Sequence, residues 1–260
     1  MKYGFIGCGN MGGALARALS KTTKDIVVAD FDTQKAETLA KELGITVGTN
    51  QEISRNCDRI FLGVKPQVMQ EMLGDIKETL GDKKPILISM AAGLTTEKIK
   101  EFAGDMPVIR IMPNTPVNVG KGVVLYCAND VKQSVIDDFV NDMKHCGKLY
   151  QIDEGLMNAG CSVSGCGPAF MYTFASAIAK GGVECGLSQS LAIEFAAATM
   201  AGAAEMLLVS NKTPDELTNA VCSKGGSTIE GVNTLKNSDF EEIVIRCIKA
   251  AYKRNQELGK

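Results

Sequence analysis

The residues best suited to chemistry stand in a glycine-rich turn near the start of the chain, Gly7-Cys-Gly9-Asn-Met-Gly12. A short apolar run precedes this turn and a helix-like pattern follows it. Gly7 permits the tight bend, Gly9 lets the backbone approach a pyrophosphate, and Gly12 lets the helix pack closely on the strand. Free amides at the helix start attract the anion. The turn therefore indicates dinucleotide binding, and a plain strand-helix turn is the alternative.

An acidic residue follows at the spacing that this chemistry needs. The strand over residues 25–30 ends in Asp30, ~18 residues past Gly12, where such folds place the carboxylate that binds the adenosine ribose. Asp32 comes next, and no arginine follows before Arg55. A 2'-phosphate beside Asp30 would meet like charge, so the pocket is expected to accept NADH. Alternatively, both acids only solvate a loop.

Three further turns follow expected strands: Val64-Lys65-Pro66, Ala91-Ala92-Gly93 and residues 112–116. Because ligands of doubly wound sheets lie beyond the carboxyl ends of the strands, we expect these turns to line one rim with the first. Small residues at 91–93 would let a flat nicotinamide approach, and Pro66 would stiffen its turn. Lys65 either contacts a phosphate or ribose or is solvated. Each turn, taken alone, is also compatible with an ordinary connection.

Two glycine-rich stretches stand out later in the chain: residues 162–170 and residues 217–231. In the first, Pro168 suits the first turn of a following helix. In the second, Gly225-Gly226 followed by Ser227-Thr228 offers backbone amides and hydroxyls at a helix start, which suits a small carboxylate. The same pattern is equally compatible with a helix C-cap followed by an N-cap.

The numbers and positions of the histidine and cysteine residues limit the catalytic mechanisms and metal sites that the chain can form. His145 is the only histidine and stands in a turn, so a solvated residue is favoured over a catalytic base. The nine cysteines form no Cys-x-x-Cys pair, and we expect no metal site. Most of the cysteines are expected to be small buried hydrophobic residues.

The elements that must position these residues alternate between strand and helix through the first half of the chain. A first strand is expected in the short apolar run before Gly7, and further strands are expected over residues 25–30, 45–47, 59–64, 85–90, 107–112, 122–127 and 148–151. Helices are expected between most of them, including 33–43, one ending near Leu80, and 131–143. This alternation predicts a parallel, doubly wound Rossmann-type α/β sheet with helices on both faces.

From about residue 153 the pattern becomes helical, with expected helices over residues 168–185, 188–209, 214–222 and 239–257. We therefore predict a dinucleotide-binding domain over 1–152 and a helical substrate-binding and dimerisation domain over 153–260. Two of the helices are apolar on nearly every face, which a domain of this size has little room to bury. A second subunit would supply the cover, giving a helix-interleaved homodimer. Stacking of the helices within one chain is the alternative.

Composition excludes several classes of partner. The chain has 45% hydrophobic and 22% charged residues, with a net charge of -2, which gives no reason to expect nucleic acid or an anionic membrane. We read no uninterrupted apolar run that approaches the ~20 residues of a membrane span, and no signal peptide. A cytoplasmic protein that acts on a small molecule is expected.

These motifs together resemble the pyrroline-5-carboxylate reductase family. Residues 221–231 look like its Val-x-Ser-Pro-Gly-Gly-Thr-Thr-Ile-x-Gly signature, residues 164–169 look like Ser-Gly-Ser-Gly-Pro-Ala, and residues 110–116 are similar to Arg-x-Met-Pro-Asn-Thr-Pro. Residues 64–67 and Asn50 also fall where the family has them. The resemblance runs from residue 3 to about 257.

Three positions depart from the family pattern. Cys166 replaces a serine, Lys224 a proline and Ser227 a threonine. Ser227 keeps a hydroxyl, so little is lost there. Lys224 frees a rigid turn and adds a cation, which either tightens substrate binding or is solvated. Thr228, the residue least expected to change, is present.

The resemblance implies reduction of 1-pyrroline-5-carboxylate to L-proline by hydride transfer from NADPH or NADH, the last step of proline biosynthesis. The family resemblance favours NADPH as the cofactor, whereas Asp30 favours NADH. Thr228 is the catalytic candidate, as a hydrogen-bonding group near the imine nitrogen. The implied substrate-binding residues are Ser223, Gly225, Gly226, Ser227, Met112 and Asn114. The implied cofactor-binding residues are Gly7, Gly9, Asn10, Met11, Gly12, Asp30, Asn50, Val64, Lys65, Pro66, Ala92 and Gly93.

If the helices of two subunits interleave, in a homodimer or a higher oligomer built from dimers, the pocket would combine one subunit's nucleotide domain with the other's helices. Two alternatives stay open. A β-hydroxyacid-dehydrogenase-like oxidoreductase would use Lys180 as its catalytic lysine but leaves the Gly-Gly-Ser-Thr stretch unexplained. A catalytically silent NAD(P)-binding sensor is suggested by the departures at Cys166 and Lys224.

Overall fold

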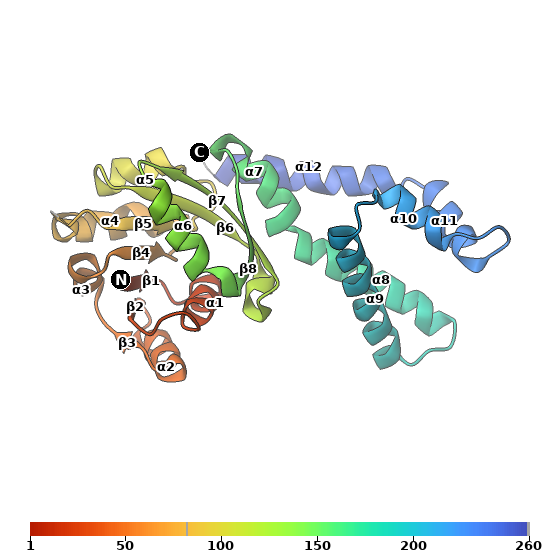
Figure 1. Ribbon diagram of the computed structural model, residues 1–260, viewed down its shortest axis with the longest axis horizontal. Helices are drawn as coiled ribbons and strands as arrows, with labels where there is room; N and C mark the ends of the chain where they lie inside the picture. Colours follow the sequence, from red (N-terminus) through yellow and green to blue (C-terminus); the bar gives the residue numbers. More distant parts are fainter. Residues whose placement is uncertain (82, 259–260) are drawn as a thin grey trace. The chain divides into compact units, whose positions relative to one another are not determined.

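A computed structural model describes residues 1–81 and 83–258 of the chain. The chain divides into two compact units, Met1–Cys166 with the residues from Ala251 onward, and Gly167–Ala250 (Figure 1). Residues 153–166 belong to the first unit in this division. The predicted boundary between a nucleotide-binding and a substrate-binding domain, after residue 152, stays a prediction.

The first unit is built on a sheet that, over the described residues, has eight strands in the order β3-β2-β1-β4-β5-β6-β7-β8 (Figure 1). In chain order the strands are β1 (Tyr3–Ile6), β2 (Ile26–Ala29), β3 (Thr46–Val47), β4 (Arg59–Leu62), β5 (Ile86–Ser89), β6 (Val108–Pro113), β7 (Gly122–Asn129) and β8 (Gly147–Gln151). The strand order reverses at β1, which is the mark of a doubly wound sheet. The predicted α/β fold class is confirmed.

Helices cover both faces of this sheet. They are α1 (Asn10–Leu19), α2 (Thr33–Leu43), α3 (Asn50–Asn56), α4 (Pro66–Leu80), α5 (Thr96–Ala103), α6 (Gln133–Asp142) and α7 (Met157–Gly160). One hydrophobic core joins α1, α2 and α6 to one face, and a second joins α3, α4 and α5 to the other. Neighbouring strand residues alternate between the two cores, as Phe5 and Ile6 do, because side-chain direction in a strand has a period of two.

The expectation of a fully parallel sheet is wrong at one place. Strands β6 and β7 pair antiparallel, whereas the other neighbouring pairs are parallel. Only a short 3-10 turn, Thr115–Val119, separates the two strands, with Gly120 at a positive φ of 70° after it. A parallel crossover needs a dozen or more residues, so this short connection can only return the chain alongside itself.

The described residues of the second unit form helices joined by turns, with no strand among them. It contains α8 (Gly167–Glu184), α9 (Gln189–Val209), α10 (Pro214–Val221), α11 (Ser227–Lys236) and most of α12 (Phe240–Leu258). Helices α8 and α9 lie side by side (Figure 1). The sequence pattern predicted four of these helices closely, and it marked α11 only by its start.

Helix α9 is apolar on nearly every side, as predicted. Ile193 and Phe195 are each 52% exposed. By length and composition alone, α9 is the one described helix that qualifies as a candidate membrane span, with a mean hydropathy of 1.5, although Glu194 and Glu205 lie within it. Exposed apolar surface of this extent on one helix is typical of an interaction surface.

Candidate active site

The glycine turn between β1 and α1 is held by close backbone contacts. Gly7 has a φ of +103°, and a Cβ there would lie 2.6 Å from the carbonyl carbon of Gly63. A Cβ on Gly12 would lie 2.1 Å from the Gly7 carbonyl oxygen. These two glycines are therefore required by the turn itself. Gly63, which the sequence analysis missed, is required too, since its Cβ would come within 2.7 Å of the same oxygen.

Gly9 differs from its neighbours because space is open around it. It adopts an extended conformation that any residue can take, and a Cβ built on it meets nothing within 4 Å. Gly9 is also the N-cap of α1, and in the described chain no side chain caps this helix start. Free amides beside an open approach form a cradle that fits the pyrophosphate of a dinucleotide. Asn10 and Met11 begin the helix at this cradle.

Asp30 fastens this turn to the next one. Its Oδ2 accepts a hydrogen bond of 2.6 Å from the Cys8 backbone amide, and its Oδ1 accepts one of 2.9 Å from the Asp32 amide. The Asp30 residue is half-buried, and its carboxylate is held by these two backbone amides rather than by solvent alone. It joins the loops after β1 and β2 at the point where a ribose is expected.

The remaining cofactor candidates lie at the same edge of the sheet. Strands β1, β4, β5 and β6 are adjacent and parallel, so the turns at their carboxyl ends line one rim. Exposed Lys65 is the N-cap of α4, with Pro66 at its first turn. Half-buried Ala92 and Gly93 follow β5, Gly93 with a φ of +81°. Asn50 starts the short helix α3, beyond β3.

Met112 lies near the end of β6 and Asn114 directly follows the strand, and both are buried. Met112 packs in a small core against which Ala92 also lies. The Asn114 side-chain amide is engaged at both ends, accepting from the Val123 amide at 2.9 Å and donating to the Ser164 carbonyl at 2.9 Å. Asn114 therefore positions the segment around Ser164, and a direct contact of this residue with substrate stays a prediction.

That segment, Cys161–Gly165, is a π-helical turn leading into α8. Such wide turns occur frequently at functional sites. Asn255, near the end of α12, donates to Ser162 Oγ at 3.2 Å, which fixes the turn from the far end of the chain. Half-buried Cys166 closes the turn, its amide donating to the Cys161 carbonyl at 2.9 Å. Pro168 lies in the first turn of α8, as predicted.

Glu154 is a second feature that the sequence analysis missed. Its carboxylate accepts hydrogen bonds of 2.7 Å from both the amide and the hydroxyl of Thr96, and one of 3.0 Å from Arg110. Thr96 begins α5 just after the Ala92–Gly93 turn, and Arg110 lies in β6. Glu154 therefore fixes the start of α5 against β6, the strand that contains Met112 and leads into Asn114. No local sequence signal marks it, because its partners are distant in the chain.

In the second unit, the Gly-Gly-Ser-Thr stretch lies between α10 and α11. Gly225 has a φ of +74°, and a Cβ on Gly226 would lie 2.5 Å from Ser223 Oγ. Gly226 is the N-cap of α11, and no side-chain hydrogen bond caps this helix within the described structure. Ser227 and Thr228, at its first positions, are exposed. The stretch is thus a genuine helix start whose amides are available to a carboxylate.

The cysteines are mostly buried. Five of the nine cysteines are buried, which confirms the prediction for most of them. Burial raises the pKa of Cys8 and of Cys146 to about 12, so both are thiols at neutral pH. Across residues 1–81 and 83–258, no cluster of three or more His, Cys, Asp or Glu residues forms a potential metal site.

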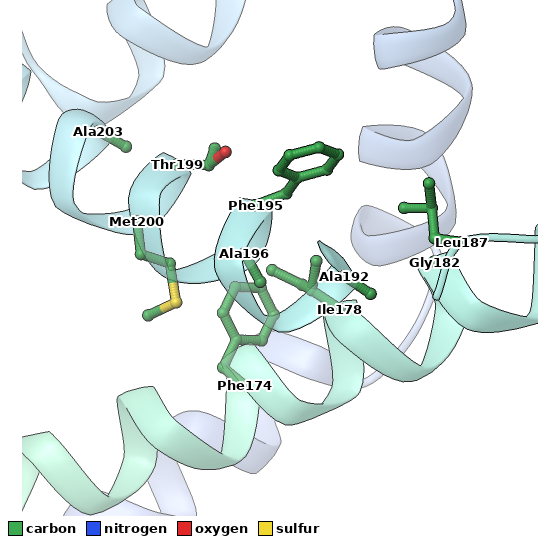
Figure 2. Close-up of a pocket in the computed structure, with 10 residues that line it drawn as sticks. All are labelled: Phe174, Ile178, Gly182, Leu187, Ala192, Phe195, Ala196, Thr199, Met200 and Ala203. Atoms are coloured by element: carbon green, nitrogen blue, oxygen red, sulfur yellow. The ribbon is translucent and has the colours of Figure 1, made fainter. Parts of the chain in front are cut away.

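The second unit carries hollows of its own on the α8–α9 pair. One, of about 310 Å³, is apolar; Figure 2 shows Phe174 and Ile178 of α8 facing Ala192 and Ala196 of α9. The other, of about 560 Å³, is lined by residues that include Lys180. None of the predicted cofactor or substrate residues lines either hollow.

Comparison with known proteins identifies the family. The reductase of Aquifex aeolicus named pyrroline-5-carboxylate reductase is 35% identical over 99% of this chain and 97% of its own length. This chain belongs to the pyrroline-5-carboxylate reductase family. The enzyme of that name from Escherichia coli K12 is 34% identical over 100% of this chain and 98% of its own. Residues 154–258 match the family model "Pyrroline-5-carboxylate reductase dimerisation", and residues 2–93 match "NADP oxidoreductase coenzyme F420-dependent".

Solved structures agree with this family assignment. A pyrroline-5-carboxylate reductase of Coxiella burnetii superposes with a TM-score of 0.92 at 27% identity, covering 100% of this chain and 98% of that one. A pyrroline carboxylate reductase of Plasmodium falciparum with NADP bound superposes with a TM-score of 0.87 at 29% identity, with the same coverage. The resemblance inferred from the motifs is confirmed in both halves of the chain.

Proposed function

We propose that this chain reduces 1-pyrroline-5-carboxylate to L-proline with NADPH or NADH, as the last step of proline biosynthesis. The observation that carries the proposal is the full-length match to reductases of this name, together with two uncapped helix starts. One of these, at Gly9, suits a pyrophosphate, and the other, at Gly226, suits a carboxylate. The two alternatives, a hydroxyacid dehydrogenase and a silent sensor, have no comparable support.

The first unit holds the cofactor in this proposal. A bound reduced nicotinamide supplies the hydride. The amides at the start of α1 bind the pyrophosphate, and Asp30 binds the adenosine ribose. The small residues Ala92 and Gly93 leave room for a planar ring at the rim. The full proposed contact set is Gly7, Gly9, Asn10, Met11, Gly12, Asp30, Asn50, Val64, Lys65, Pro66, Ala92 and Gly93.

The second unit binds the substrate carboxylate in this proposal. The backbone amides of Gly225, Gly226 and Ser227 hold the carboxylate, with Ser223 as a further substrate contact. Met112 and Asn114, in the first unit, are the other proposed substrate contacts. The Thr228 hydroxyl forms a hydrogen bond at the imine nitrogen, whose protonation makes the neighbouring carbon electrophilic. The protein then has mainly to orient its two ligands, which is consistent with a chain that has a single histidine.

The assembly that we propose is a cytoplasmic homodimer, or a higher oligomer built from dimers, with no nucleic-acid or membrane partner. The exposed apolar sides of α8 and α9, including Ile193 and Phe195, lie in the segment that matches the dimerisation model. A second copy would cover them. Light scattering of the detergent-free protein should give twice the chain mass or a multiple of it, and a monomer would contradict this assembly.

Two matched substitutions at one position test the proposed mechanism. Thr228→Ala removes the hydroxyl and should lower kcat by ~100-fold, within the range expected for a group that assists proton transfer. Thr228→Ser keeps the hydroxyl and should retain kcat within a few-fold. Cofactor dissociation constants, measured by calorimetry, should be the same in both. An unchanged kcat in Thr228→Ala would remove this residue from the mechanism.

A further inference from the structure

The loop that follows β2 carries an unusual pair of acids at the adenosine end of the cofactor site. Asp30 and Asp32 flank Phe31, whose side chain is fully exposed. Both Asp30 oxygens already accept backbone amides, from Cys8 and from Asp32. Asp30 therefore has a fixed position, and each of its oxygens keeps one lone pair free for a ribose hydroxyl.

The nearest cation in the sequence after this loop is already paired. Lys35, in the first turn of α2, lies 3.4 Å from Asp32, Nζ to Oδ2, and both side chains remain about half exposed. No lysine or arginine stands between Asp30 and Lys35. An anion arriving beside this loop therefore meets two carboxylates, and the first cation along the chain is paired with one of them.

We infer that this loop selects NADH over NADPH, with separate roles for the two acids. Asp30 binds the ribose hydroxyls and fastens the glycine turn. Asp32 holds Lys35 away from the place where a 2'-phosphate would lie, and exposed Phe31 offers its ring to the adenine. The inference deepens the proposed function, since it concerns the same cofactor site, but its test needs no substrate.

The distinction between the two acids makes the inference specific. Removing Asp30 also removes the acceptor for the Cys8 amide, so it should weaken both cofactors. Removing Asp32 leaves that link intact, because the Asp32 bond to Asp30 is made by its backbone amide. It also frees Lys35 to meet a phosphate that carries between one and two negative charges. The gain should therefore be confined to the phosphorylated cofactor.

Calorimetric titration of the purified full-length protein with NAD⁺ and NADP⁺ tests this. The wild type should bind NAD⁺ at least ten-fold more tightly. Asp32→Asn should tighten NADP⁺ about ten-fold, with NAD⁺ changed by less than about three-fold. Adding Lys35→Gln to that variant should cancel the gain. Glu37→Gln, which removes the same charge one turn further along α2, is the matched control and should change neither affinity appreciably.

Two results would overturn the inference. One is a wild type that binds NADP⁺ as tightly as NAD⁺ or more tightly. The other is a gain for NADP⁺ that is equal in Asp32→Asn and Glu37→Gln, which would mean that net charge alone matters. A protein that prefers NAD⁺ yet fails to reduce 1-pyrroline-5-carboxylate would refute the proposed function and leave this inference standing.

Discussion

Alanine substitutions of Gly9 and Gly12, which lie at the start of α1, should affect folding and cofactor binding differently. At Gly12 an added Cβ would lie 2.1 Å from the Gly7 carbonyl oxygen, which is backbone and has no freedom to rotate away. At Gly9 an added Cβ meets no protein atom within 4 Å. One substitution therefore strains the protein, and the other intrudes only on the space left for a ligand.

The expected magnitudes follow from these contacts. Overpacking of this kind costs ~1–3 kcal/mol, and a contact with backbone places Gly12→Ala at the upper end or beyond. For a unit of this size, ~3 kcal/mol lowers the melting temperature by roughly 6–12 °C. Gly9→Ala should cost at most ~1 kcal/mol, because alanine is a poorer N-cap than glycine but the extended backbone there accepts it without strain.

Thermal unfolding without cofactor and calorimetric titration with NAD⁺ measure the two effects separately. Gly9→Ala should melt within about 4 °C of the wild type and bind NAD⁺ at least ten-fold more weakly. Gly12→Ala should lose both stability and binding. If Gly9→Ala bound the cofactor as the wild type does, the pyrophosphate would not lie against this turn, and our account of the cradle would be refuted.

Two other features give direct tests. Asn114→Ala leaves the Val123 amide and the Ser164 carbonyl without their hydrogen-bond partner. It should lower the free energy of unfolding in urea by ~2–4 kcal/mol, and it should lower kcat because the π-helical turn is displaced. An unchanged free energy of unfolding would contradict the positioning role of Asn114. Burial raises the pKa of Cys8 and Cys146 from 9.0 to about 12, so the folded protein stays protonated where the unfolded chain ionises, and stability should fall as pH rises above about 9. Urea unfolding at increasing pH checks this, with iodoacetamide labelling of both thiols expected only after unfolding.

The sequence pattern predicts the sheet and the glycine turn well because both depend on local signals. Alternating apolar runs mark the strands, and Gly7, Gly9 and Gly12 follow one of them directly. The antiparallel direction of β7 was missed because the length of the connection before it was not compared with the length that a parallel crossover needs. A connection too short to contain a helix is the sequence signal for an antiparallel strand.

The contacts that support the site could not be predicted from local sequence patterns. Glu154 binds Thr96, 58 residues away, and Asn114 donates to Ser164, 50 residues away. Such pairs are chosen by the folded sheet, which brings distant turns to one edge. Asp30 lies between these cases: its spacing marks it as a ribose ligand, but its bond to the Cys8 amide became visible only in the folded protein.

Deuterium transfer tests the central claim most directly. The protein should be incubated with 1-pyrroline-5-carboxylate and a reduced cofactor that carries deuterium on the transferred position of nicotinamide C4, and the product analysed by mass spectrometry and chiral chromatography. We predict L-proline with one deuterium, at the former imine carbon, formed at a rate that falls ~100-fold in Thr228→Ala. Absence of labelled proline, from a preparation that binds the cofactor, would contradict the proposed reaction.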